Sequence, residues 1–415
     1  MTAIEKAYEL AREAYAVYGV DTDEAMKLLD NIAVSFHCWQ FDDVLGFEAK
    51  GRSLSGGIQT TGNYPGRARN FDEVTSDFAK ALSYIPGMNK VNVHAMYLSD
   101  GYADRNAIEP PNFDSWIDWA NELGVGLDFN PSFFSHEHAE SGYTLASADS
   151  GVRDFWIEHG KRCRKVAEYM GKKTGKICVN NIWIPDGEKE VPIDTTSPRE
   201  RFADALDKMC SHKYSHMIDA LESKLFGIGS EAYVVGSHEF VMGYTLTRQN
   251  LLLCMDAGHF HPTETVSAKL SSALMFAKKG VLLHVSRPIR WDSDHVVSYD
   301  DETRALMREL VRVGKLDKTY IATDYFDASI MRVMAMAIGG RNTKKALLEA
   351  LLQPVGRLRN LERDGDRSAR LAITEELKAM PLSAVWDYYC HKNSVLCGMQ
   401  WIRDAKAYEK TLDRA

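Results

Sequence analysis

Acidic and imidazole side chains end four successive apolar segments in the second half of the chain, and their types suit metal chemistry. An isolated acid at such a position is more often a helix cap or an ion-pair partner, but four consecutive segment ends are not explained that way. Carboxylates with a few imidazoles bind Mg²⁺, Mn²⁺, Co²⁺ or Zn²⁺, and an excess of carboxylates favours the first two. Seven candidate ligands favour two ions about 4 Å apart over a single ion. These candidates are Glu222, Asp256, His259, His284, Asp292, Asp294 and Asp324.

The spacing within two of these segments places side chains on a common side. Asp292 and Asp294 are two residues apart, so in extended backbone both carboxylates point the same way and can bind one ion. Glu222 and Lys224 share a face by the same rule, which puts a fixed cation beside the candidate ligands. A metal at this position can polarise a carbonyl group and lower the pKa of an adjacent hydroxyl or of bound water.

Eight short apolar segments, rich in β-branched residues, predict the strands that would carry these side chains. Eight strands, each followed by a helix, form a closed (β/α)₈ TIM barrel, an α/β fold whose catalytic residues gather at the carboxyl ends of the strands. The fifth segment also fits the end of the preceding helix. The predicted strands are 32–38, 90–98, 125–130, 176–184, 217–222, 251–256, 281–286 and 319–324. The predicted helices between them are 71–84, 113–123, 152–172, 198–212, 239–248, 264–277 and 301–313.

The sequence predicts one elaborated domain with an appended part. Residues 1–326 would form the barrel with an N-terminal helix, and residues 327–415 an additional C-terminal helical extension. Pro354 and Pro381 interrupt the helical patterns of this extension. Its unusual aromatic content indicates that it packs on the barrel and also lies in an oligomer interface.

Composition excludes several classes of protein. A net charge of −8 argues against a basic surface for nucleic acid or anionic membranes. There is no run of 18 apolar residues that would span a membrane, and the first residues lack the apolar segment of a signal peptide. The seven scattered cysteines, without a C-x-x-C pair, indicate free thiols in a reducing compartment. We therefore expect a cytoplasmic protein that binds neither nucleic acid nor membrane.

A glycine-rich segment, residues 56–66, follows the first predicted strand. It matches neither the phosphate-binding loop nor the dinucleotide-binding fingerprint. We interpret it as a mobile loop and a candidate lid over the carboxyl end of the barrel.

Long and uncommon strings of this sequence closely resemble those of L-rhamnose isomerases. They are GNYPGRARN, VNVHA, NIWIPDG, DAGHFHPTE, LLHVSRPIRWDSDHV and DYFDASI, and the resemblance runs almost from one end of the chain to the other. It implies a (β/α)₈ barrel related to xylose isomerase, assembled as a homotetramer. It also implies interconversion of L-rhamnose and L-rhamnulose with two divalent ions, most commonly Mn²⁺, with Mg²⁺, Co²⁺ or Zn²⁺ as alternatives.

The resemblance also implies roles for individual residues. One ion would be held by Glu222, Asp256, His284 and Asp324. The second would be held by His259, Asp292 and Asp294, with Asp256 near enough to bridge. The residues expected to contact the sugar are His94, Trp183, Trp39, Lys224 and Asp327. The expected catalytic residues are Lys224 and His94 from the sugar contacts and Asp324 from the metal ligands.

Aldose–ketose isomerisation moves a hydrogen between C1 and C2 and a proton between O1 and O2. A hydride shift needs no carbon base, whereas an ene-diol route does; the relationship to xylose isomerase favours the hydride shift. The alternative function is a related metal-dependent TIM-barrel isomerase or epimerase acting on another aldose. The methyl group of a 6-deoxy sugar needs an apolar pocket, for which Met96, Phe129 and Ile58 are candidates.

Overall fold

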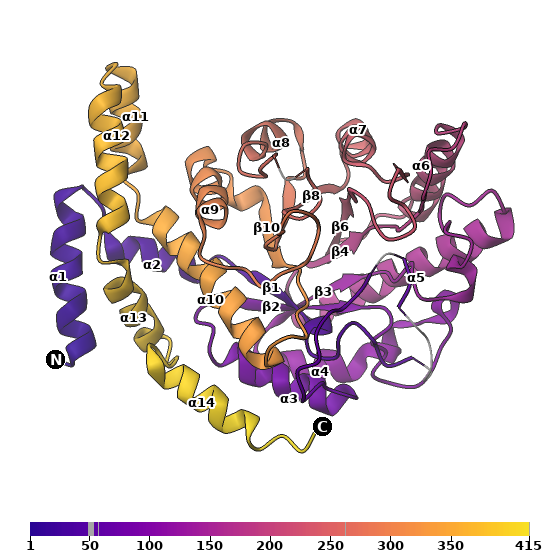
Figure 1. Cartoon of the computed structure of the whole chain (residues 1–415), viewed down its shortest axis with the longest axis horizontal. Helices are drawn as coiled ribbons and strands as arrows, with labels where there is room; N and C mark the ends of the chain where they lie inside the picture. Colours follow the sequence, from indigo (N-terminus) through magenta and orange to yellow (C-terminus); the bar gives the residue numbers. More distant parts are fainter. Residues whose placement is uncertain (49–53, 57, 262, 415) are drawn as a thin grey trace.

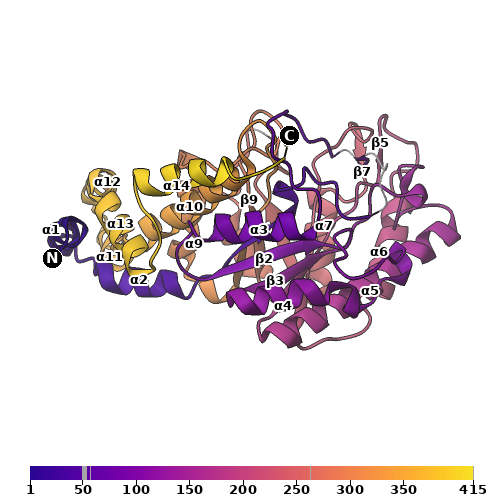
Figure 2. The same cartoon turned by 90° about the horizontal axis from the view of Figure 1, so that it is seen from below.

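The computed structural model describes residues 1–48, 54–56, 58–261 and 263–414. Eight parallel strands close into a barrel in the order β1-β10-β9-β8-β6-β4-β3-β2, with helices around it (Figures 1 and 2). The predicted TIM barrel is therefore confirmed. Its strands are β1 (Val34–His37), β2 (Asn89–His94), β3 (Gly126–Asn130), β4 (Cys178–Ile182), β6 (Met217–Glu222), β8 (Leu252–Asp256), β9 (Val281–Val285) and β10 (Thr319–Thr323).

The segment that also fitted a helix end is the strand β6, with the bounds predicted for it. Several strands are shorter than predicted, because the chain turns once it leaves the barrel. After β2, for example, the backbone N–H of Tyr97 donates to the carbonyl of His94 in a turn. A separate two-stranded antiparallel sheet pairs β5 (Gly187–Glu188) with β7 (Tyr233–Val234).

The barrel is covered by helices that follow its strands in the chain. These are α3 (Phe71–Leu82), α4 (Asp114–Leu123), α5 (Ser150–Thr174), α6 (Ser197–Met209), α7 (His238–Arg248), α8 (Leu270–Phe276), α9 (Asp301–Val313) and α10 (Arg332–Leu351). The helix predicted over 264–277 is wrong in its first turns. The backbone N–H and hydroxyl of Ser267 bond to the Glu302 carboxylate on α9, which holds this segment as a loop.

The remaining helices lie at the two ends of the chain. They are α1 (Ala3–Val17), α2 (Thr22–Asp30), α11 (Val355–Arg363), α12 (Arg367–Glu376), α13 (Leu382–Lys392) and α14 (Met399–Glu409). Short 3₁₀ turns are η1 (Cys38–Gln40), η2 (Arg105–Ala107), η3 (Pro110–Phe113), η4 (Glu137–Ala139), η5 (Leu316–Lys318) and η6 (Leu377–Ala379). The α11–α12 pair projects from the body beside α1, whereas α13 and α14 run along it (Figure 1).

The helix α10 packs against α9, α2, α3 and β1. It therefore occupies the place of the helix that follows the eighth strand of a barrel. The division predicted between residues 326 and 327 stays a prediction, and the packing of α10 favours a boundary after α10 instead. No helix in the described ranges is long and apolar enough to cross a membrane. All seven cysteines are free thiols.

Strand alternation decides which side chains face the barrel interior. A small interior cluster includes Ala220, Cys254, Leu282 and Ala322, one each from β6, β8, β9 and β10. Alternate residues of a strand point to the same face, so the residue two positions further along each strand also points inward. Those positions lie at the carboxyl end of the barrel, and their residues are Glu222, Asp256, His284 and Asp324.

Candidate active site

Four side chains from four neighbouring strand ends converge at the carboxyl end of the barrel. Each offers one ligand atom, and these four atoms all lie within 4.8 Å of one another. Three of the residues are buried and Asp324 is partly buried. They are Glu222, Asp256, His284 and Asp324, the set that the sequence predicts for the first ion.

A second group lies beside the first and shares a residue with it. One ligand atom from each of Asp256, His259 and Asp292 lies within 4.8 Å of the others, and all three residues are buried. Asp256 therefore belongs to both groups. Asp294 lines the same cavity but is not a member of this second group. Its backbone has φ of +44°, a conformation that non-glycine residues adopt at a cost in free energy.

The turn after β8 brings the two groups together. The backbone N–H of Gly258 donates to Asp256 Oδ1 at 2.6 Å, which fixes that carboxylate at the strand end. A Cβ atom on residue 258 would lie only 2.4 Å from Asp292 Oδ1. A larger residue here would displace the Asp292 carboxylate, which approaches the backbone of Gly258 closely.

Several polar atoms of these groups are buried without a hydrogen-bond partner in the described residues. His284 Nδ1 lies 3.1 Å from Glu222, 3.5 Å from Asp256 and 3.4 Å from Asp324, yet it forms no hydrogen bond to any of these carboxylates. Asp256 Oδ2 and Asp292 Oδ1 are also unpartnered. An unsatisfied buried polar atom costs about 1–3 kcal/mol. Donor atoms that converge in this way fit a divalent cation, which would satisfy them together.

The electrostatics of the site also favour bound positive charge. Burial acts to lower the pKa of His259, but the carboxylates of Asp256 and Asp292 together outweigh it, and the pKa rises to about 9. Burial acts to raise the pKa of Asp324, but the neighbouring His284 outweighs it and lowers the pKa to about 2. Neighbouring cationic groups also lower the pKa of Glu222 and Asp292, so these two carboxylates and Asp324 stay ionised at neutral pH and make the site negative. Burial instead raises the pKa of Asp256 and Asp294.

Lys224 supplies the fixed cation at the edge of the second group. Its Nζ donates to Asp292 Oδ2 at 2.5 Å and lies 3.1 Å from His259 Nε2. Burial acts to lower the pKa of Lys224, but the adjacent Asp292 carboxylate raises it above its ordinary value. The ammonium group also lies 5.7 Å from the centre of the Trp183 ring. Lys224 is thus a permanent positive charge between the ligands and an aromatic wall.

A cavity of about 190 Å³ is lined by six of these residues: Glu222, Lys224, His259, Asp292, Asp294 and Asp324. Trp39, His94 and Trp183, for which the resemblance implies sugar contacts, also line it. Trp39 Nε1 donates to Asp324 Oδ1 at 3.0 Å, and its ring lies edge-on to His94 with centroids 4.8 Å apart. Of the three candidates for a methyl pocket, only Ile58 lines this cavity. Buried Phe129 packs against Phe113 instead.

Asp327, predicted to bind substrate, does not line the cavity. Its carboxylate accepts the backbone N–H and the hydroxyl of Ser329, while its own backbone bonds to Gln40. These local bonds turn the side chain away from the ligand groups. A substrate contact by Asp327 remains a prediction that the geometry does not favour.

Sequence reasoning missed several residues of the cavity wall. Phe134 stacks on Trp183 with centroids 5.4 Å apart and lies edge-on to His94. Behind the wall, Asn181 Nδ2 donates to Glu222 and fixes that carboxylate. Both residues belong to the carboxyl ends of β3 and β4 or the loops after them, which is the signal that could have identified them. Phe226 and Trp291 complete an aromatic rim.

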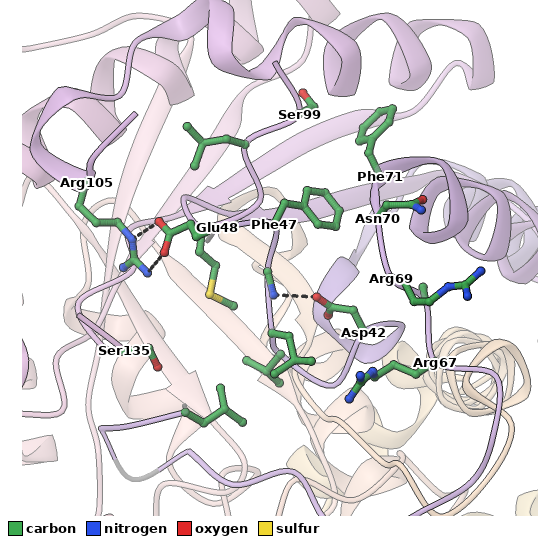
Figure 3. Close-up of a pocket in the computed structure, with 17 residues that line it drawn as sticks. Asp42, Phe47, Glu48, Arg67, Arg69, Asn70, Phe71, Ser99, Arg105 and Ser135 are labelled. Carbon is green, nitrogen blue, oxygen red and sulfur yellow. Dashed lines mark hydrogen bonds and ion pairs between the residues drawn. The ribbon is translucent and has the colours of Figure 1, made fainter. Parts of the chain in front are cut away.

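A larger cavity of about 490 Å³ lies next to this one, and both include Val44 in their walls. Figure 3 shows its polar contacts: the Arg105–Glu48 ion pair and the bond from the Gly46 backbone to Asp42. The metal-competent groups found among the described residues all lie outside it. The smaller cavity is therefore the candidate active site.

Comparison with known proteins shows the family to which the chain belongs. A family model described as L-rhamnose isomerase (RhaA) matches residues 2–414. The chain is 54% identical over 412 residues to the L-rhamnose isomerase of Listeria innocua, covering 99% of this chain and 98% of that relative. It is 52% identical over 414 residues to that of Citrobacter koseri, with the same coverage. A solved L-ribulose 3-epimerase shares the fold, with a TM-score of 0.50 at 12% identity over 79% of this chain and 97% of that one. The chain therefore belongs to the L-rhamnose isomerase family, a family of aldose–ketose isomerases.

Proposed function

We propose that this protein interconverts L-rhamnose and L-rhamnulose with two divalent cations bound at the carboxyl end of the barrel. The observation that carries the proposal is the pair of overlapping donor groups that share Asp256. One cation would be held by Glu222, Asp256, His284 and Asp324, and the other by Asp256, His259, Asp292 and Asp294. When bound, such ions polarise the carbonyl and hydroxyl oxygens of a sugar and lower the pKa of the hydroxyl.

Lys224 would stabilise negative charge that develops on the sugar oxygens. Its ammonium group is partly buried, positively charged and already oriented by Asp292. A preorganised charge of this kind needs no rearrangement when the transition state forms, so it stabilises that state more than water would.

Asp324 would move the proton between O1 and O2. Its carboxylate lines the cavity and is ionised at neutral pH, which is the form that can accept a proton and return it. The indole of Trp39 donates to Asp324 Oδ1 and holds the carboxylate toward the cavity.

His94 and Trp183 would bind and orient the sugar. Burial lowers the pKa of His94 to about 3, so its imidazole is neutral and suits a hydrogen bond to a sugar oxygen. Trp183 and Trp39 present aromatic faces to the cavity, which suit the C–H surface of a sugar ring. Ile58 would contact the methyl group of the 6-deoxy sugar.

We also propose Mn²⁺ as the ion in use, a homotetrameric assembly and a cytoplasmic location. The excess of carboxylate ligands supports Mn²⁺, and the free thiols support a reducing compartment.

The test is isomerisation of L-rhamnose by protein from which metal has been removed, with and without added Mn²⁺. We expect ketose to form only with the metal. Equal activity in chelator and in Mn²⁺ would contradict the two-ion proposal, and no ketose under either condition would contradict the assignment of substrate.

A further inference from the structure

A short segment after β1, which we call the strap (residues 58–66), forms part of the cavity wall. Ile58, Gln59 and Thr61 of the strap line the cavity together with several of the candidate metal ligands. The strap contains no regular helix or strand, so its position depends on contacts with other parts of the chain. Figure 2 shows this indigo region beside the C-terminal end of the chain.

The first set of contacts joins the strap to the loop after β10. The backbone N–H of Tyr64 donates to the carbonyl of Ala328 at 2.8 Å, and the N–H of Ala328 donates to the carbonyl of Thr61 at 3.2 Å. Gly62 has φ of +125°, and a Cβ atom there would lie 2.2 Å from the carbonyl carbon of Ala328. The strap therefore packs directly against a loop that begins near Asp324.

Arg332, the first residue of α10, makes the second set. Its guanidinium binds both carboxylate oxygens of Asp43, at 2.8 and 2.7 Å. It also donates to the carbonyls of Tyr64 at 2.9 Å and Pro65 at 3.3 Å. Arg332 is buried and forms a bidentate ion pair with Asp43, which lies between β1 and the strap. Arg332 therefore joins this part of the chain to the end of the strap.

The third set comes from α14, more than 340 residues further along the chain. The hydroxyl of Tyr64 donates to Glu409, and Lys406 pairs with the same carboxylate and lies 3.4 Å from that hydroxyl. Tyr64 is thus bonded at its backbone to α10 and the β10 loop, and at its side chain to α14. These contacts leave the strap little freedom to move from the cavity.

We propose that Tyr64 and Glu409 are positioning residues for substrate binding, through which the C-terminal helix α14 holds the strap against the sugar. The inference rests on the proposed position of the sugar in the cavity of about 190 Å³. The metal ligands come from the strand ends and the loops after β8 and β9, so they do not depend on the strap. Loss of the Tyr64–Glu409 bond should therefore weaken sugar binding and spare the metal-dependent chemistry.

The experiment compares Tyr64→Phe and Glu409→Gln with the wild type in the full-length, Mn²⁺-loaded enzyme. Each variant removes one partner of the bond. We expect the KM for L-rhamnose to rise about 3- to 10-fold, with kcat within about twofold, since a contact that binds substrate and transition state equally changes KM alone. The double variant should match the single ones, because both remove the same interaction.

Asp404→Asn is the matched control. Asp404 also lies on α14, but it bonds to Lys80 and Tyr84 on or next to α3 and does not touch the strap. It should leave KM unchanged. Amide hydrogen exchange adds a readout independent of turnover: residues 58–66 should exchange faster in Tyr64→Phe and Glu409→Gln, and at the wild-type rate in Asp404→Asn.

The inference would be overturned if the wild type is active and both variants have the wild-type KM and the wild-type exchange rate in the strap. An equal KM rise in Asp404→Asn would also overturn it, because that result reports general loosening of α14. A wild type that does not isomerise L-rhamnose would instead contradict the proposed function, and strap exchange would still test the tie between Tyr64 and Glu409.

Discussion

The hydroxyl oxygen of Ser132 lies 3.0 Å from Nδ1 of His94, and it also accepts the backbone N–H of Met96 at 3.2 Å. Ser132 is buried, and His94 Nδ1 is the acceptor that the described residues offer to its hydroxyl proton, so that proton is directed to His94 Nδ1. The proton of the neutral imidazole then lies on Nε2. Ser132 therefore makes the other ring nitrogen of His94 a hydrogen-bond donor.

The substitution Ser132→Ala should reduce kcat/KM for L-rhamnose about 10-fold, because residues that orient a functional histidine typically contribute 10- to 100-fold. Steady-state kinetics measure this effect. Ser141→Ala is the control, since the Ser141 hydroxyl bonds only within its own exposed loop, to the Tyr143 backbone. Unchanged kinetics in Ser132→Ala would show that His94 needs no such orientation.

Asp256 belongs to both donor groups, so Asp256→Asn should weaken the binding of both cations. His259→Gln should weaken only the second, because His259 is absent from the first group. Calorimetric titration of metal-free protein with Mn²⁺ counts the sites. We expect two sites in the wild type, one strong site in His259→Gln and none of comparable affinity in Asp256→Asn. Retention of two strong sites in His259→Gln would refute the assignment of the second group.

Asp294→Asn should lower the isomerase activity by about 100-fold or more and leave the fold intact. Asp294 lines the cavity beside Asp292, and burial together with the Asp292 charge raises the pKa of Asp294 well above its ordinary value. Ketose formation and circular dichroism measure the two effects. Asp301→Asn is a control, because the Asp301 side chain is fully exposed on α9. Wild-type activity in Asp294→Asn would exclude Asp294 from the second site.

Lys344 on α10 should make stability depend on pH. It is fully buried near the amino ends of β1 and β2, where its Nζ donates to the carbonyls of Met88 and Ile32. Burial lowers its pKa to about 7, and the nearby charge of Asp30 opposes this only in part. The unfolded chain, with a lysine pKa of about 10.4, then binds more protons than the native state between pH 7 and 10. The free energy of unfolding therefore rises with pH in that window and loses this contribution as pH falls toward 7.

The measurement is urea unfolding of the wild type and of Lys344→Met at pH 7 and pH 9. As the pH rises, the free energy of unfolding of the wild type should increase relative to that of Lys344→Met, by at most about 1.4 kcal/mol per pH unit. A difference that is independent of pH would show that Lys344 stays protonated in the folded protein.

The sequence by itself determined the fold and most of the candidate metal ligands. Apolar segments with β-branched residues predict the strands, and the period of two within a strand decides which side chains face inward. Asp256 lies two residues after Cys254, and Asp324 two residues after Ala322, so each shares the interior face of its strand. Once the barrel closes, these strand ends must meet, so local spacing was sufficient to predict the group.

Only the tertiary structure decided how the loops contribute. Asp327 lies close to Asp324 in sequence, but its bonds to Ser329 turn it from the cavity. Phe134 enters the wall because it stacks on Trp183, which comes from another loop. Tyr64 is held by Glu409, at the far end of the chain. Such contacts depend on the relative positions of distant elements, and no periodicity within a segment encodes them; local spacing therefore predicts the strand ends and leaves the loop contacts to the assembled fold.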